Sequence, residues 1–205
     1  MSLDDTLSVF YRKHGFGETI GRRPLTVPVY TGCMLVPLPN IETRRRFLKY
    51  HDLHHLITGY SVGRIGEGEV SAWELGTGSM FVSPTLGVMN LIALSTGLAL
   101  APKRMWRAYL RGCRSRNLYP AAMRTDVDAG RWQDVQALRA EVLETTATVR
   151  CLSLRALEYG GYCAAAALVH ACIAIPAVIT RFITDISLGY SVFQAVKPRK
   201  RTDLY

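Results

Sequence analysis

Three histidines fall within five residues of this chain, and a glutamate follows shortly after them. The run is His51-Asp52-Leu53-His54-His55, and eleven residues separate it from Glu67. Imidazole nitrogens and carboxylate oxygens are the ligands with which a protein replaces the water around a divalent ion. The segments that carry these groups must then fold against each other, so the pattern predicts a metal site.

Helix geometry orders these candidates, because each residue turns about 100° around a helix axis. With His51 at zero, His55 falls near 40° and Asp52 near 100°, so the three project from one face. His54 falls about 60° to the other side of His51. We therefore expect His54 to support a ligand or to lie on the surface.

The segment from Asn40 to Thr58 is predicted to be a helix. Asn40 is a suitable N-cap, apolar residues recur at intervals of three and four, and Gly59 is a natural helix stop. The loop at 60–66 is expected to turn the chain so that a second helix, beginning near Glu67, faces the histidines.

The spacing leaves alternatives open. Histidine-rich helix surfaces are often only solvated, and Glu69 and Glu74 compete with Glu67 as carboxylate ligands. On a helix Glu67 and Glu69 lie about 200° apart, so only one of them can face the histidines. Three glycines near these glutamates, Gly63, Gly66 and Gly68, resemble a phosphate-binding loop. No strand precedes them, so we interpret them as a flexible connection between helices.

The stretch HDLHHLITGYSVGRIGE, from His51 to Glu67, resembles the HDxxH-x11-E signature of the fourth-numbered protein family of coenzyme Q (ubiquinone) biosynthesis. Gly59 and the later run Gly130–Arg139 agree with that family's pattern. The resemblance covers about residues 10 to 145, and the motif is its specific part. The chain departs from the pattern at His54 and beyond about Thr145.

The resemblance implies an all-helical protein that lies peripherally on the membrane where quinone is made. It implies a divalent ion, zinc first and iron, cobalt or manganese as alternatives, held by His51, Asp52, His55 and Glu67. It also implies one of two roles in ubiquinone biosynthesis. The first is a lyase that carries out oxidative decarboxylation at ring carbon one of a polyprenylated hydroxybenzoate, and the second is a prenyl-lipid-binding scaffold for the other biosynthetic proteins.

The composition sets the expected organisation. With 205 residues, 49% hydrophobic and 20% charged, the chain is long enough for one domain with a real core. We expect a helical bundle with the metal site between two helices over residues 1–158. Residues 159–205 are expected to form an apolar helix and a basic tail that docks on a membrane. Self-association into a homo-oligomer is compatible with this pattern.

Two long stretches carry no charge, Leu75 to Pro102 and Tyr159 to Thr180. In the first, only Leu86 to Leu100 is uniformly apolar, and its length is typical of a buried core helix. The second is expected to dock on or enter a membrane. Between them, Asp128 to Tyr159 is predicted to be one long amphipathic helix, and residues 15–39, rich in Pro and Gly, an extended connection.

The net charge of +9 gathers in two basic runs, Lys103 to Arg116 and Lys197 to Arg201. Each lies near an apolar stretch, which favours an anionic membrane surface over nucleic acid. The five cysteines have no CxxC spacing, so we expect small core residues in a reducing compartment. The acidic start Met-Ser-Leu-Asp-Asp favours the bacterial cytoplasm, peripheral to the inner membrane; the eukaryotic equivalent is the matrix side of the mitochondrial inner membrane.

Three functions follow from these features. In the first, a metal-dependent enzyme polarises a polyprenylated aromatic acid, Leu86 to Leu100 line a groove for the prenyl tail, and Arg64 pairs with the substrate carboxylate, although solvent exposure is the plainer expectation for Arg64. In the second, the protein is a scaffold, and the ion has only the structural role of holding two helices together. The third, a membrane di-iron oxygenase with an HxxHH box, needs more histidines than the five in this chain.

Overall fold

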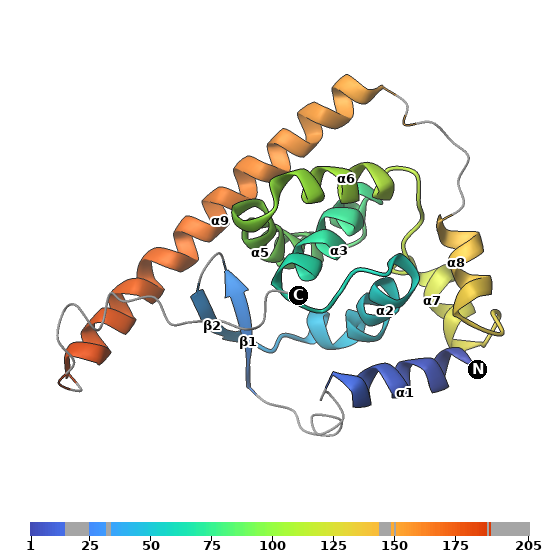
Figure 1. The fold of residues 1–205 in the computed structure, drawn as a ribbon, viewed down its shortest axis with the longest axis horizontal. Coiled ribbons are helices and arrows are strands. Elements are labelled where there is room, and N and C mark those ends of the chain that lie inside the picture. The colour runs from blue at the N-terminus through green and yellow to red at the C-terminus, as the bar shows by residue number, and fades with distance from the viewer. Residues whose placement is uncertain (15–24, 32–33, 144–148, 150, 188, 190–205) are drawn as a thin grey trace.

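The protein is all-α, as predicted, with one short hairpin (Figure 1). The computed structural model describes residues 1–14, 25–31, 34–143, 149, 151–187 and 189. The helices are α1 (Leu3–Lys13), α2 (Glu42–Thr58), α3 (Arg64–Gly76), α4 (Ser79–Val82), α5 (Pro84–Leu100), α6 (Pro102–Gly112), α7 (Ala121–Asp128), α8 (Val135–Leu143) and α9 (Leu152–Ser187). The strands are β1 (Thr26–Thr31) and β2 (Met34–Pro39).

Helix α3 is the centre of the bundle. It contacts α2, α5 and α6, and nearly all of its side chains are buried, including Trp73 at 0% exposure. Helix α5 contacts both α3 and α9, which confirms the prediction that Leu86 to Leu100 form a buried core helix. The same packing covers most of this segment, so it does not form the open groove expected for a prenyl tail.

Glycines allow the central helices to approach closely. A Cβ at Gly68 would lie 2.7 Å from Cα of Gly97, and one at Gly112 would lie 2.1 Å from the carbonyl oxygen of Trp73. Gly66 and Gly68 lie inside α3, and a Cβ at Gly66 would lie 1.9 Å from the carbonyl oxygen of Ser61. The interpretation of these two glycines as a flexible connection was therefore wrong, because tight packing needs them.

The predicted metal-binding helix is α2, with small differences at its start. The N-cap is Ile41, and the side chain of Asn40 instead accepts a hydrogen bond from Arg44 (3.3 Å). Gly59 ends the helix in the left-handed conformation (φ 78°), as predicted from its ease of adopting positive φ. This stop sets up the short turn that leads into α3.

The prediction of one helix from Asp128 to Tyr159 was wrong. Helix α7 ends at Asp128, Gly130 has a φ of 70°, and α8 covers only Val135–Leu143. The side chain of Asp134 accepts a hydrogen bond from the backbone N–H of Ala137 (2.9 Å), which caps the first turn of the new helix. A left-handed glycine followed by this cap divides the amphipathic pattern.

The extended connection predicted before Asn40 contains a two-stranded antiparallel hairpin. Its register runs from Thr26 opposite Pro39 to Thr31 opposite Met34, with Pro28 opposite Pro37. Both strands of a two-stranded sheet are edge strands, so they can accommodate prolines. Residues 15–24 of the predicted connection lie outside the described part of the chain.

Helix α9 runs diagonally along one side of the bundle, next to α5 and α6 (Figure 1). Tyr159 packs against the rings of Trp106 and Tyr109, and Nδ1 of His170 lies 2.9 Å from Oγ1 of Thr31 on β1. The expected domain boundary at residues 158 and 159 falls inside this helix, and Ala166 beyond it is fully buried. One side of α9 thus belongs to the packed body.

The other side of α9 exposes apolar side chains, among them Leu157 (75%), Leu168 (66%) and Ile175 (61%). Leu152–Pro176 has a mean hydropathy of 1.4 and is long and apolar enough to cross a membrane, judged by length and composition alone. Within its most apolar window, 6% of the residues are buried. The basic tail, Lys197 to Arg201, lies outside the described residues.

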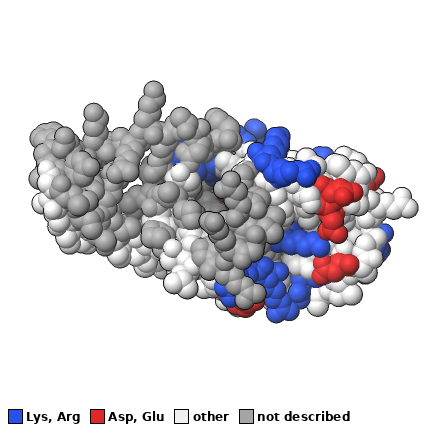
Figure 2. All heavy atoms as spheres, turned by 90° about the horizontal axis from the view of Figure 1, so that it is seen from below, with Lys and Arg blue, Asp and Glu red and all other residues white. Residues whose placement is uncertain are grey.

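Two arginines of the basic run on α6 make contacts within the described part of the chain. Lys103 and Arg107 are exposed, whereas Arg104 pairs with Glu69 and Arg111 donates to the carbonyl oxygen of Thr58 (2.8 Å). On the face shown in Figure 2, which is the underside of Figure 1, basic and acidic side chains are interspersed where described residues are visible. Among the described residues visible there, positive charge is therefore broken up by acidic side chains.

The cysteines differ from their expected burial. Cys113 and Cys163 are partly buried, and Cys151 and Cys172 are exposed; all four are free thiols. The prediction that they are core residues was wrong for Cys151 and Cys172, whereas Cys113 packs against the hydrophobic core, and Cys33 lies outside the described residues. Cys113 caps the end of α6, Cys151 precedes α9, and Cys163 and Cys172 lie on α9.

Candidate metal centre

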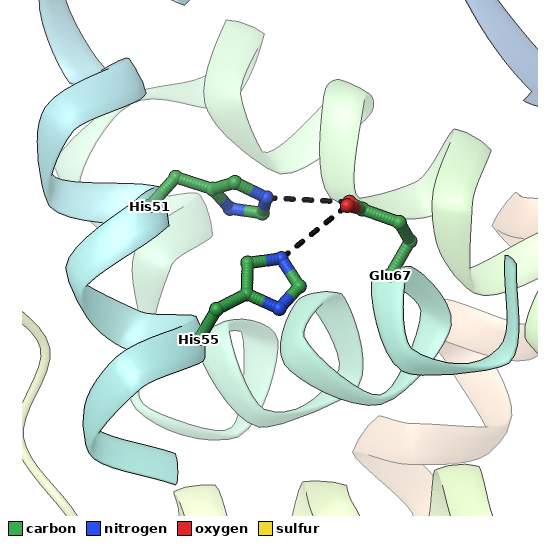
Figure 3. Close-up of side chains that lie close together, drawn as sticks. All are labelled: His51, His55 and Glu67. Atoms are coloured by element: carbon green, nitrogen blue, oxygen red, sulfur yellow. Dashed lines mark hydrogen bonds and ion pairs between the residues drawn. The ribbon is translucent and has the colours of Figure 1, made fainter. Parts of the chain in front are cut away.

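Helices α2 and α3 bring three of the predicted ligands together. His51 and His55 lie one turn apart on α2, and Glu67 lies in the first turn of α3. Nε2 of His51 is 3.3 Å from Oε2 of Glu67, and Nε2 of His55 is 3.4 Å from Oε1 of the same carboxylate. One candidate ligand atom of each residue lies within 4.8 Å of the others, and both rings face the carboxylate (Figure 3). This group could hold a divalent ion.

The outer nitrogen of each imidazole is held by another group. Nδ1 of His55 lies 3.1 Å from the carbonyl oxygen of Tyr60 and must donate, because a carbonyl oxygen only accepts. Nδ1 of His51 lies 2.9 Å from Oε1 of Glu74, which is fully buried. The Nε2 atom of each ring then faces the carboxylate of Glu67. Metal-binding histidines are held in this way, with the far nitrogen donating to a carbonyl or carboxylate.

Nε2 of His55 supports the fit of a metal most directly. It is buried and makes no hydrogen bond to any residue in the described part of the chain. Buried polar atoms normally have partners, and an ion bound beside Glu67 would supply one. Two imidazole nitrogens and one carboxylate are a donor set that suits zinc and other divalent transition metals.

The electrostatics of the group also favour a cation. Burial lowers the pKa of His51, but the nearby carboxylates of Glu74 and Glu67 outweigh it and raise the pKa well above the ordinary value. Burial acts on Glu67 in the opposite sense, yet the adjacent imidazoles of His55 and His51 hold its pKa below the usual range. Two carboxylates around two imidazoles thus form a pocket that stabilises positive charge.

The site is open on one side. The side chain of Glu67 is 39% exposed and that of His51 is 21% exposed, whereas His55 is 1% exposed. The ligands therefore lie at the edge of the bundle, with their inner sides in the core.

Asp52 lies outside the group formed by the other three predicted ligands. It is buried, and burial raises its pKa, while the nearby hydroxyl of Tyr11 on α1 lowers that pKa in part. About 100° around the helix from His51, it is turned toward α1. Its role as a ligand stays a prediction.

His54 is fully buried, so it supports the site from the core and is not a surface residue. Its Nδ1 lies 2.7 Å from Oε1 of Glu74, and its Nε2 accepts a hydrogen bond from the backbone N–H of Leu118 (3.0 Å). Both nitrogens are occupied, as expected for a histidine beside the ligand face. Burial lowers the pKa of His54, which favours the neutral ring.

The alternative carboxylates have other partners. Glu69 forms a bidentate ion pair with Arg104, with distances of 2.8 and 2.6 Å, and points away from the histidines. Glu74 contacts His51, but at Nδ1 and not at the nitrogen that faces Glu67. The geometry therefore favours Glu67 over both competitors.

Arg64 is buried at 5% exposure, so the expectation of a solvent-exposed arginine was wrong. Its guanidinium lies 5.1 Å from the ring centroid of Tyr30 on β1. A cation over an aromatic face is stabilised by the ring quadrupole. This contact ties the start of α3 to the hairpin.

Sequence reasoning gave Glu74 no role beyond that of a competitor and missed Tyr119, whose hydroxyl lies 2.6 Å from Oε1 of Glu74. The role of Glu74 had a signal, because seven residues after Glu67 is two helical turns and the same face. No sequence signal pointed to Tyr119, since it lies far along the chain after α6.

Comparison with known proteins adds no further residue. No family model, curated protein or solved structure matches this chain.

Proposed function

We propose that this protein binds a divalent metal ion at His51, His55 and Glu67 and acts in ubiquinone biosynthesis. The proposed reaction is oxidative decarboxylation at ring carbon one of a polyprenylated hydroxybenzoate. The observation that carries the proposal is the convergence of these three side chains in the HDxxH-x11-E pattern. Zinc is the expected ion, with iron, cobalt or manganese as alternatives.

The number of converging ligands favours an enzyme over a scaffold. Structural zinc sites are closed by four protein ligands, whereas catalytic sites keep three and leave a position for water or substrate. Here three residues converge, Asp52 lies outside that group, and Glu67 is partly exposed. When bound, the ion would supply Lewis acidity toward a ring hydroxyl or carboxylate.

The protein side chains have separate tasks in this proposal. Glu74 and the carbonyl group of Tyr60 orient the two imidazoles, and the buried side of the group keeps water away from His55. Arg64 is not assigned to the substrate, because it is buried against Tyr30.

The exposed apolar side of α9 supports a site of action at a membrane. Leu157, Leu168 and Ile175 offer apolar surface to lipid, and Lys103 and Arg107 on α6 offer charge to anionic headgroups. A polyprenylated substrate resides in the bilayer, so a peripheral protein would meet it there. The same apolar side favours the second candidate, a scaffold that binds prenyl lipid and other biosynthetic proteins.

Elemental analysis of the purified full-length protein, combined with mass spectrometry of co-purifying lipids, tests the proposal. We expect about one divalent ion per chain and a prenylated ring compound. A matched His55→Ala preparation should lose the metal. The scaffold gains support if lipid is retained without metal, and the proposed chemistry fails if neither is found in folded protein.

Decarboxylation separates the two candidates further. Metal-loaded protein in vesicles that contain a prenylated hydroxybenzoate and an added oxidant should release carbon dioxide. Protein with Glu67→Ala should release none above background. Equal release by the two proteins would remove the metal centre from the reaction.

A further inference from the structure

A buried carboxylate lies behind the proposed metal centre. Glu74 is on α3, two turns after Glu67, and has 0% exposure. Its Oε1 lies 2.9 Å from Nδ1 of His51, 2.7 Å from Nδ1 of His54 and 2.6 Å from the hydroxyl of Tyr119. One oxygen atom thus gathers three hydrogen-bonding groups.

The hydrogen-bond directions follow from the neighbouring groups. The backbone N–H of Leu118 donates to Nε2 of His54, so Nδ1 of this neutral ring carries the hydrogen and donates to Glu74. A carboxylate accepts, so the Tyr119 hydroxyl donates as well. The imidazole of His54 and the hydroxyl of Tyr119 therefore fix the position of Oε1 independently of His51.

The consequence for His51 is specific. With Oε1 fixed, Nδ1 of His51 must carry a hydrogen, and the ring is held with Nε2 toward Glu67. A carboxylate partner also makes the opposite nitrogen a stronger donor to a metal. His55 has only the neutral carbonyl group of Tyr60 at the same position, so the two histidines are supported unequally.

We propose that Glu74 is the positioning residue of the metal centre, held in turn by Tyr119 and His54. This inference rests on the metal site of the proposed function. Glu74 orients His51 and does not bind the ion. The competing role is purely structural, in which Glu74 only satisfies two donors of the core.

A pair of substitutions separates charge from hydrogen bonding. Oε2 of Glu74 makes no hydrogen bond to a described residue, so in Glu74→Gln an amide NH2 can replace it while the carbonyl oxygen keeps the three donors. Glu74→Met removes the acceptor as well. We expect Co²⁺ affinity, measured by competition with a chelator, to fall about tenfold in Glu74→Gln and about a hundredfold in Glu74→Met.

The visible absorption spectrum of bound Co²⁺ gives a readout that stability alone does not move, because it reports ligand geometry. It should change in Glu74→Met. Glu69→Gln is the matched control, since Glu69 is on the same helix, is nearly buried and pairs with Arg104 away from the site. Its affinity and spectrum should equal those of the wild type.

The outcomes are distinguishable. Failure of the wild type to bind Co²⁺ overturns the proposed metal centre and this inference with it, whereas wild-type affinity and spectrum in a folded Glu74→Met protein overturn the positioning role alone. If both Glu74 variants fail to fold, Tyr119→Phe decides, because it removes one donor to Oε1 and keeps the ring. A fall of about threefold supports the inference, and unchanged affinity overturns it.

Discussion

Nδ1 of His51 lies 2.9 Å from Oε1 of Glu74, and the opposite nitrogen of the same ring lies 3.3 Å from Oε2 of Glu67. Both glutamates are on α3, two turns apart. Helix α3 thus holds the ring of a residue on α2 from both sides. This relationship links the packing of the bundle to the proposed metal centre.

Removing either histidine ligand should abolish metal retention. His51→Ala and His55→Ala each leave two of the three converging groups, and the ligand helices stay packed through apolar residues such as Leu53 and Ile57. Elemental analysis should find no metal while helical circular dichroism is largely unchanged. His170→Ala is the control, because it removes a histidine that is hydrogen-bonded to Thr31 on β1. This variant should keep the metal.

Substitution of Glu67 and substitution of Glu69 should have opposite effects on metal retention. Glu67→Ala should lose the metal, because its carboxylate faces both histidines. Glu69→Ala should keep it and lose about 1–3 kcal/mol of unfolding free energy, since Arg104 loses its nearly buried partner. Metal loss in Glu69→Ala with retention in Glu67→Ala would shift the motif by two residues.

His54→Ala should be destabilised yet keep its metal. The fully buried ring leaves a cavity and an unpaired backbone N–H of Leu118, at a cost of about 2–4 kcal/mol in unfolding free energy. Chemical denaturation measures that cost. At saturating metal the stoichiometry should equal that of the wild type, and metal loss like that of His55→Ala would contradict the geometry.

Metal removal should lower the stability of the wild type. The ligands come from two helices, so an ion binds the folded chain and not the unfolded one. With free metal at about 100 times Kd, folding gains about 2.7 kcal/mol, which chelation would remove. Thermal unfolding with and without chelator measures this loss of stability. In His55→Ala, which should bind no metal, the chelator should have no effect.

Binding to anionic liposomes should depend on the exposed side of α9. Truncation near Arg155 would also remove Tyr159 and Ala166 from the core, so paired substitutions are the cleaner test. Leu168→Glu with Ile175→Glu should weaken binding sharply, because both side chains are exposed and apolar. High salt should weaken wild-type binding only in part, since salt screens charge and not apolar contact.

Phe81→Ser is the matched control for that test. Phe81 is 83% exposed on α4, which packs against α3 and α5, so its loss should leave binding by α9 unchanged. Wild-type protein that ignores liposomes at low salt would refute the membrane prediction. A stable dimer that buries Leu168 and Ile175 would then explain the exposed side.

Several features predicted from local pattern were confirmed. Helical spacing placed His51 and His55 together, Gly59 stopped α2, and the buried character of Leu86 to Leu100 followed from its uniform apolarity. Each of these features depends on residues close together in the sequence, so the local sequence pattern is enough to predict it. The motif spacing also selected Glu67 from three nearby glutamates.

The features that were missed depend on distant contacts or on competing local conformations. Tyr119 meets Glu74 only because the segment after α6 returns to α3. Gly130 and the cap at Asp134 divide a segment whose apolar period suits one helix. Asp52 has the spacing of a ligand and lies outside the group of three converging side chains, so its role as a ligand stays a prediction.

X-ray absorption at the metal edge of zinc-loaded protein tests the central claim most directly. The account predicts a first shell of nitrogen and oxygen at about 2.0–2.1 Å, with the outer-shell scattering of two imidazoles. His55→Ala, if it retains any ion, should show the scattering of only one imidazole. A wild-type shell with sulfur at about 2.3 Å, or one without imidazole, would contradict the assignment of His51, His55 and Glu67 as the metal centre.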